Sequence, residues 1–286
     1  MPAAACGIVG LKPTHGLVSK YGCFPLSWSL DHIGPMTKTV EDAAVFLEFI
    51  AGFDEKDPTT VNRPHKNYAS YLTGDIKGKV IGIEEDYFFN DVNSDVERLV
   101  KEGIKQLESL GARVELIKIP SLKYSGYISA MTVSGEGGTI HQRNIKTRFN
   151  DYGKDVQDYI KTAYAVSATD YLEAQQLRRV LAQEFAQVFE KVDVIIAPSL
   201  HTLPPMIGDD VSGGKLGRFS SPANITGLPA ISVPCGISEG LPVGMQIIGP
   251  AFKEEEVLNF AYTFEKTNPL QGVGPVIEKA LSKNIG

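Results

Sequence analysis

The spacing of apolar positions predicts a helix near the start of the chain and a polar segment after it. Apolar residues recur with the period of an α-helix over residues 40–51, and Gly52 follows as a stop signal. Thr39 stands where a helix cap is expected, with two acidic residues directly behind Val40. Residues 53–78 are rich in Asp, Pro, Asn and Gly, which predicts a long surface segment.

A strand–helix–strand pattern comes next in the chain. The apolar run 79–83 predicts a strand, and residues 94–110 predict a helix whose apolar side chains share one face. A capping box over Ser94–Glu97 is expected to open that helix, and residues 113–119 predict a second strand. At this spacing the three segments form a βαβ unit, which places the two strands parallel.

Residues 124–190 are predicted to be mostly helical. The longest helix is expected to run from about Thr169 to Glu190. Its inward-facing side chains are expected to be Leu172, Leu177, Val180, Leu181, Phe185, Val188 and Phe189. Ser134–Gly138 is predicted to be a turn rather than a nucleophile motif, because Thr132 stands where that motif needs a glycine.

Further buried strands and a closing helix are predicted in the last third of the chain. The uninterrupted apolar run 194–197 is typical of a strand buried on both faces. Residues 230–235 and 243–248 predict two more strands joined by a turn. A long Gly-rich loop is expected over 198–221, and an amphipathic helix over 253–266 is expected to precede a loose tail.

Helices that alternate with buried strands indicate an α/β fold, with a mixed β-sheet core covered by helices on both faces. No linker interrupts the pattern, so residues 1–286 are expected to form a single domain. The net charge of −6 argues against nucleic acid as a partner, and no apolar run approaches the roughly 18 residues that cross a membrane. The three cysteines lack CxxC spacing, which suggests no disulfide framework and predicts a cytoplasmic location, where thiols stay reduced. The five histidines are scattered along the chain, so no metal site is expected.

The first 36 residues have an unusual composition. They contain five glycines and four prolines, which supply tight turns, close backbone approaches and fixed dihedral angles. Apolar side chains such as Ile8, Phe24 and Trp28 lie between them, so the stretch differs from a flexible polar linker. It predicts closely packed loops and short strands around a site.

Four motifs in this order carry a resemblance to a known family. They read P-A-A-A-C-G-I-V-G-L-K-P-T at 2–14, S-L-D-H-I-G-P-M at 29–36, P-A-N-I-T-G-L-P-A-I-S-V-P-C-G at 222–236 and G-L-P-V-G-M-Q-I-I-G at 240–249. The chain resembles the amidase signature family of amide hydrolases over nearly its whole length. This resemblance implies the family's α/β/α core, a small amide as substrate and no cofactor.

The same resemblance implies that the catalytic residues lie outside the sequence. Family members use a Ser–Ser–Lys relay, and their serine nucleophile stands in a Gly-Gly-Ser segment a few residues before the Pro-Ala that matches Pro2-Ala3. The chain therefore resembles an amidase that begins just after its nucleophile, with its N-terminal part missing. Lys12 matches the lysine of the G-L-K-P motif, downstream of the nucleophile, and is not assigned as the catalytic base. No catalytic residue is assigned, and the chain alone is expected to be inactive.

Asp31 is the candidate for active-site support. The matching acid of the family helps to hold the nucleophile region in place. The alternative is a turn aspartate that caps local N–H groups. By analogy with the family, the substrate pocket is expected to be lined by Trp28, Met131, Thr202, Phe219 and Asn224. Each of these five residues is also consistent with ordinary core packing.

Three hypotheses for function follow from the resemblance. The first is the C-terminal portion of a free-standing amidase, with a homodimer expected through its exposed N-terminal face. The second is a catalytically dead binding or scaffold subunit. The third, ranked lower, is the A subunit of the tRNA-dependent amidotransferase. That branch carries an R-Y-G motif and glutamine-holding residues, and the chain instead reads Asn150-Asp151-Tyr152-Gly153 and has Gly217 ahead of Pro222.

Overall fold

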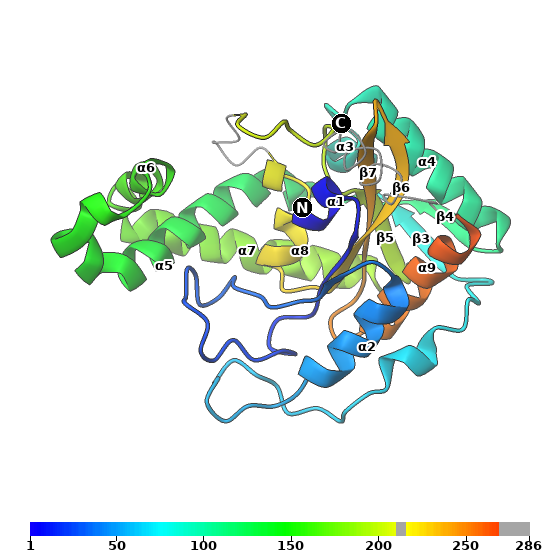
Figure 1. Ribbon diagram of the computed structural model, residues 1–286, viewed down its shortest axis with the longest axis horizontal. Coiled ribbons are helices and arrows are strands. Elements are labelled where there is room, and N and C mark those ends of the chain that lie inside the picture. The colour runs from blue at the N-terminus through cyan, green and yellow to red at the C-terminus, as the bar shows by residue number, and fades with distance from the viewer. Residues whose placement is uncertain (210–215, 269–286) are drawn as a thin grey trace, which may run out of the picture.

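The computed structural model describes residues 1–209 and 216–268, and these form one twisted sheet with helices on both of its faces (Figure 1). The strands are β1 (Val9–Lys12), β2 (Met36–Thr37), β3 (Val80–Ile83), β4 (Arg113–Leu116), β5 (Val194–Pro198), β6 (Ala230–Ser238) and β7 (Leu241–Ile248). The helices are α1 (Pro2–Cys6), α2 (Val40–Ile50), α3 (Glu85–Phe88), α4 (Ser94–Ser109), α5 (Ser125–Arg148), α6 (Lys154–Ala163), α7 (Ala168–Val188), α8 (Ser221–Ile225) and α9 (Glu254–Thr267). Short 3-10 helices cover Tyr68–Tyr71, Pro120–Tyr124 and Phe149–Asp151. The predicted tail and residues 210–215 of the predicted loop lie outside the described residues.

The sheet is mixed, as the apolar runs predict. Its strand order in the described chain is β2-β1-β6-β7-β5-β3-β4. β3 pairs in parallel with both β4 and β5, so the predicted βαβ unit of β3, α4 and β4 is confirmed. β1, β6 and β7 form an antiparallel part of the sheet, which joins β5 through β7. Thr39 caps α2 as predicted by accepting a hydrogen bond from the Asp42 amide.

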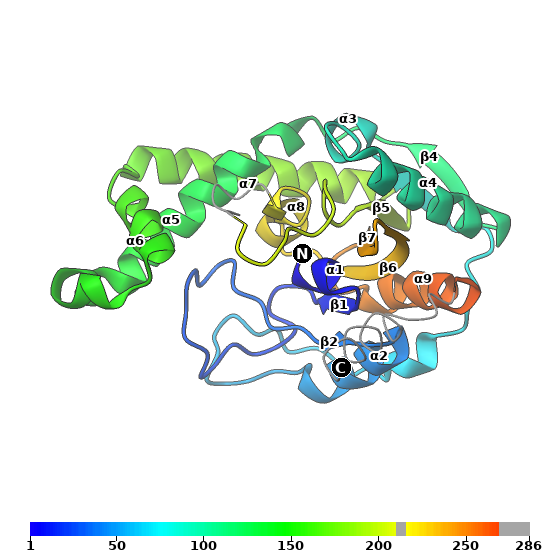
Figure 2. The ribbon, with the colours of Figure 1, turned by 45° about the horizontal axis from the view of Figure 1, so that its top comes forward.

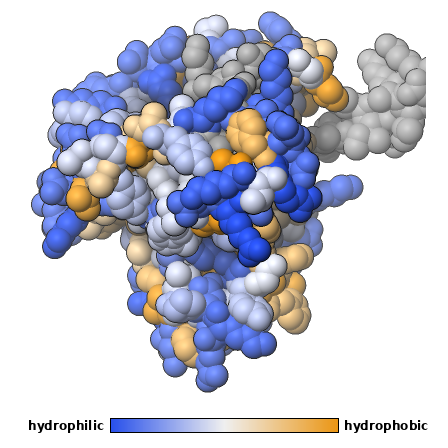
Figure 3. Space-filling view, turned by 90° about the vertical axis from the view of Figure 1, so that its left-hand side faces the viewer, coloured by the Kyte–Doolittle hydropathy of each residue, from blue (hydrophilic) through white to orange (hydrophobic). Residues whose placement is uncertain are grey.

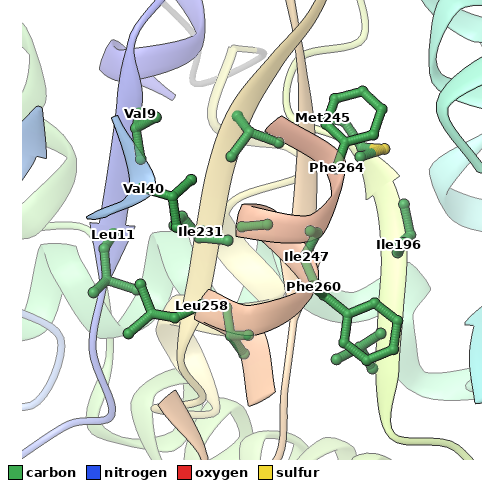
Figure 4. Packing of buried hydrophobic residues seen from close by; sticks show 14 of the residues in the cluster. Val9, Leu11, Val40, Ile196, Ile231, Met245, Ile247, Leu258, Phe260 and Phe264 are labelled. Carbon is green, nitrogen blue, oxygen red and sulfur yellow. The ribbon is translucent and has the colours of Figure 1, made fainter. Parts of the chain in front are cut away.

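One face of the sheet packs against α2, α4 and α9. Alternate strand residues, among them Ile196, Ile231 and Ile247, point to this face and meet the apolar sides of the three helices. Figure 4 shows Phe264 of α9 beside Met245 of β7. Gly103 of α4 leaves room for this contact, because a Cβ there would lie 3.1 Å from the Phe264 ring. This face forms the larger hydrophobic core.

The opposite face packs against α3, α5, α7 and α8. Ile195 and Ile248 of the sheet meet Ile128 of α5 and Phe185 of α7 in a second buried cluster. The two clusters share one sheet, so the expected α/β core with helices on both faces is confirmed. In Figures 1 and 2, α6 and the neighbouring end of α5 extend away from the sheet. The second face carries the polar residues described below.

The structure corrects several details of the predicted helices. α4 is capped by Asn93 and not by a box at Ser94, since the Asn93 side chain accepts from the Asp95 and Val96 amides. The longest helix is α5, which includes the predicted turn over Ser134–Gly138. Its glycines allow close packing: a Cβ on Gly135 would lie 3.0 Å from the Tyr171 ring.

The predicted inward face of α7 is also partly wrong. Leu172 and Val180 are 60% and 44% exposed, whereas Ala174, Leu181 and Phe185 are buried. Helical period alone leaves the direction of the buried stripe undetermined when apolar residues occur around the helix. Contact with α5 selects the stripe that is buried.

Candidate functional site

A stripe of polar side chains crosses the second face of the sheet. Ser232 of β6 stands opposite Gly10 of β1 and Gln246 of β7 in the strand register, so these positions share one face. The hydroxyl of Ser232 lies 2.7 Å from that of Ser199, which follows β5. Gln246 donates to the carbonyl of Phe219 at 2.8 Å. Polar groups in the middle of a buried sheet face are expected where a site opens.

A cavity of about 440 Å³ opens above this stripe. Its floor includes Gly10, Lys12, Ser199, Ser232 and Gln246, and its walls include Asp31, His32, Ser221 and Asn224. The first helix covers one side, because Met1, Pro2 and Ala3 also line the space. We call this space the sheet cavity. A volume of this size is in the range of small-molecule sites.

A second cavity of about 480 Å³ lies on the other side of the loop that carries Asp31 and His32. Its lining includes Tyr21, Phe24 and Trp28, three exposed aromatic side chains. We call it the aromatic cavity. Asp31 and His32 line both cavities and therefore form the wall between them.

Asp31 is held at one of its two carboxylate oxygens. Its Oδ2 accepts hydrogen bonds from the amides of Leu26 at 2.9 Å and Ser27 at 3.0 Å. Among the described residues no hydrogen bond goes to Oδ1. The residue therefore caps a local turn and also stands on the cavity wall with one oxygen left to accept a bond.

Basic groups surround the wall. The Lys20 ammonium donates to the Trp28 carbonyl at 2.7 Å and lies 3.1 Å from Nε2 of His15. His15 and His32 are in edge-to-face contact, with ring centroids 5.1 Å apart. Burial, together with the charges of Lys20, Arg178 and Lys12, lowers the pKa of His15 to about 4.

His32 is held as a neutral ring. Its Nδ1 donates to the Leu30 carbonyl at 2.7 Å, and its buried Nε2 has no hydrogen-bond partner in the described part of the chain. Burial first, and then the charge of Lys12, lowers the pKa of His32 to about 2. Burial also lowers the pKa of Lys12 to about 7, against the opposing effect of Glu254. An amine of this kind is partly neutral near pH 7.

The structure brings three of the six predicted site residues onto the cavity walls. Asp31 and Asn224 line the sheet cavity, and Trp28 lines the aromatic cavity. Phe219 is fully buried in the second core cluster, where ordinary packing explains it. Met131 on α5 and Thr202 after β5 are partly buried and lie on neither cavity wall. Contact of any of these residues with a substrate stays a prediction.

The sequence patterns did not single out several residues of the site. Ser232 and Gln246 are polar residues at inward positions of buried strands, where apolar residues are usual. This departure from the apolar pattern is a sequence signal that could have identified them as site residues. Glu136 sits fully buried in a segment that was predicted to be a turn. Among the described residues, no group of three or more His, Cys, Asp or Glu side chains could hold a metal ion.

Comparison with known proteins places this site in a family. The model of the Amidase family matches residues 1–258, so the chain belongs to the amidase signature family. It is 41% identical to the A subunit of the glutamyl-tRNA(Gln) amidotransferase of Listeria welshimeri, over 93% of the chain and 61% of that protein. The corresponding protein of Halothermothrix orenii is 39% identical with the same coverage.

Solved structures agree with the sequence relatives. The chain superposes on the A subunit of the glutamyl-tRNA(Gln) amidotransferase of Thermotoga maritima with a TM-score of 0.82 and 36% identity, over 95% of the chain and 60% of that protein. A bacterial aryl acylamidase of the amidase signature family gives 0.82 and 25% identity, over 94% and 60%. The chain thus spans about 60% of the length of the relatives that it matches.

Proposed function

We propose that this chain is the C-terminal portion of an amidase signature hydrolase that cleaves the C–N bond of small amides. In this proposal it supplies the sheet cavity and the Asp31 wall, and a further segment supplies the nucleophile, the bridging serine and the lysine. The observation that carries the proposal is the position of Asp31 and the polar sheet stripe on one cavity. The chain matches only about 60% of the length of its relatives, and this partial coverage supports the proposal.

The proposed reaction follows the family relay. A serine hydroxyl attacks the amide carbonyl, its proton passes through the second serine to the neutral lysine, and the C–N bond breaks as the amine leaves with a proton. Water then attacks the acyl-enzyme and releases the acid. In this chain the polar floor would contact the substrate, and Asp31 would hold the segment that carries the nucleophile through its second oxygen. Without that segment the chain alone would be inactive.

The comparisons raise the rank of a second candidate, the A subunit of the tRNA-dependent amidotransferase. The relatives given above at 39–41% identity carry that name, whereas the aryl acylamidase is 25% identical. The higher identity to the amidotransferase subunits favours glutamine as the amide substrate and the other amidotransferase subunits as partners. The departures at Asn150–Gly153 and Gly217 still favour a free-standing amidase. The remaining proposals are a homodimer through the N-terminal face and a catalytically dead scaffold subunit.

Location and ligands belong to the same proposal. No helix in the described part of the chain is long and apolar enough to cross a membrane. We expect a cytoplasmic protein that needs no cofactor and binds neither nucleic acid nor a lipid surface.

The test joins the chain to the upstream region of the Listeria welshimeri protein that it does not match. Amide hydrolysis is then measured on glutamine and on an aryl anilide, with the chain alone as the control. We expect the joined protein to hydrolyse at least one amide and the chain alone to hydrolyse neither. Preference for glutamine supports the amidotransferase candidate, and preference for the anilide supports the free-standing amidase. A joined protein that melts cooperatively yet hydrolyses neither favours the scaffold role.

A further inference from the structure

Ser29, two residues before Asp31, is held at every polar atom it possesses. Its amide donates to Oε2 of Glu136 at 3.0 Å, and its hydroxyl donates to Oε1 of Glu136 at 2.6 Å. Arg178 donates to the hydroxyl oxygen at 2.8 Å and to the carbonyl oxygen at 3.0 Å. A helix residue from α5 and one from α7 therefore fix this loop position from two sides.

Glu136 is completely buried, and both of its carboxylate oxygens are fully used. Oε2 also accepts from the Ser27 hydroxyl at 2.5 Å, and Oε1 also accepts from the Tyr171 hydroxyl at 3.1 Å. A buried carboxylate is costly unless such donors surround it. Because four donors converge here, the charge specifies one geometry for the loop.

Arg178 extends the same network to the far wall of the sheet cavity. Its Nε donates to the carbonyl of Ile225 in α8, directly after Asn224, which lines the cavity. The planar guanidinium contacts the loop at Ser29 and α8 at Ile225 at once, a task that suits its fixed fork of donors. The two walls are thereby held at a fixed separation.

Asp31 belongs to the same turn, residues 27–31, which we call the held turn. The Asp31 amide donates to the Ser27 carbonyl at 2.8 Å, and the Asp31 carboxylate accepts from the Ser27 amide at 3.0 Å. A shift of Ser27 or Ser29 would therefore move Asp31. We propose that Glu136 and Arg178 are positioning residues that hold Asp31 on the wall between the two cavities, a role that rests on the proposed function for its effect on catalysis.

The first arm of the test needs no activity. Trp28 is the one tryptophan of the sequence and lies between Ser27 and Ser29, so its fluorescence reports the held turn. In the chain as it stands, Glu136→Gln should lower the anisotropy of Trp28 and raise its acrylamide quenching above the level set by its 46% exposure, because local opening becomes easier. Glu84→Gln is the matched control, since Glu84 is 3% exposed and caps α3.

Two milder variants keep the test decisive if Glu136→Gln fails to fold. Ser29→Ala removes only the hydroxyl that links Glu136 to Arg178, and Arg178→Lys keeps the charge but loses the fork. Both should increase quenching of Trp28. Unchanged quenching and anisotropy in all the folded variants would overturn the proposal, whatever the activity of the chain.

The second arm uses the joined protein. Glu136→Gln and Arg178→Lys should lower kcat roughly tenfold to a hundredfold with a smaller change in KM, as expected for a misplaced supporting group. Glu84→Gln should lower the melting temperature without this loss of kcat. If Trp28 loosens while kcat stays at the wild-type value, the network is structural only and the positioning role is wrong. If the joined wild-type protein is inactive, the result contradicts the proposed function and not the positioning role. The fluorescence measurements then still decide whether Glu136 and Arg178 hold the turn.

Discussion

Glu136 and Ser29 lie 107 residues apart in the sequence, yet the Glu136 carboxylate accepts hydrogen bonds from both the amide and the hydroxyl of Ser29. This contact joins the loop of the N-terminal motif to the long helix α5. The loop places Asp31 and His32 between the sheet cavity and the aromatic cavity. The site therefore depends on a buried polar contact as much as on the hydrophobic core.

Two substitutions at Asp31 should separate its two roles in the joined protein. Asp31→Asn keeps an oxygen that can accept from the Leu26 and Ser27 amides but removes the charge. If Asp31 supports the nucleophile, kcat should fall roughly tenfold to a hundredfold with little change in KM. Asp31→Ala should also lose the cap, at a cost of about 1 kcal/mol in the free energy of unfolding. Steady-state kinetics and urea unfolding measure the two effects; an Asn variant with the wild-type kcat would leave Asp31 as a turn cap only.

Lys12→Met should stabilise the chain near neutral pH. Burial lowers the pKa of Lys12 to about 7 from its usual 10.5, so the charged form is disfavoured in the folded state. The cost is present in full below about pH 7 and disappears as the pH rises to 10.5. Replacing the amine with an apolar side chain should gain about 1–3 kcal/mol at pH 6 and less at pH 9.

Urea unfolding at the two pH values measures this difference. Lys105→Met on the surface of α4 is the control and should change neither value appreciably. A Lys12→Met variant that is less stable than the wild type at both pH values would show that the ammonium stabilises the sheet.

Acid should destabilise the chain through His15 and His32. Their folded-state pKa values of about 4 and about 2 lie below the usual 6.5, so the unfolded state binds more protons as the pH falls from 6.5. Stability should therefore decrease from pH 6.5 towards pH 4. The urea midpoint at pH 7 and pH 5 tests this, and His32→Asn should reduce the loss. His65→Asn, at an exposed position, should leave it unchanged; an equal loss in both variants would contradict the assignment to His32.

The loop near the aromatic cavity exposes apolar surface. Phe24 is 77% exposed and Leu26 is 45% exposed, whereas Val9 and Leu11 of the same N-terminal stretch are buried. Figure 3 shows that hydrophobic side chains reach the surface at several separate places on one face. We expect the isolated chain to bind a hydrophobic dye and to dimerise through the N-terminal loop.

Sedimentation velocity measures this association. Phe24→Ser should weaken the dimer roughly tenfold or more, since burying such a side chain contributes about 1.5–3 kcal/mol. Phe49→Ser on α2 is the control, because Phe49 is 84% exposed but lies outside that loop. A dimer that Phe49→Ser weakens and Phe24→Ser leaves intact would place the interface on α2.

The sequence predicted the sheet and most helices because their signals are local. Thr39 caps α2 through a contact three residues away, and the continuous burial of β5 follows from an apolar run of adjacent residues. The buried stripe of α7 could not be predicted in the same way, because it depends on packing against α5, where Gly135 lies against the Tyr171 ring.

The site was predictable only in part for a related reason. Asp31 and Asn224 stand within recognisable motifs, so the resemblance named both as candidate site residues, and both line the sheet cavity. Glu136 lies in a glycine-rich segment whose local pattern favours a turn, and its role comes from donors more than 100 residues away. The low pKa of His32 depends first on its burial by the fold and then on the charge of Lys12, which folding brings near from β1.

Labelling with a fluorophosphonate serine probe tests the central claim most directly. The claim is that this chain contributes a wall of an amidase site whose nucleophile lies on another segment. We expect no labelled serine between Ser19 and Ser282 in the chain alone, and one labelled serine in the added segment of the joined protein. Stoichiometric labelling of a serine of this chain, located by peptide mass spectrometry, would contradict the claim.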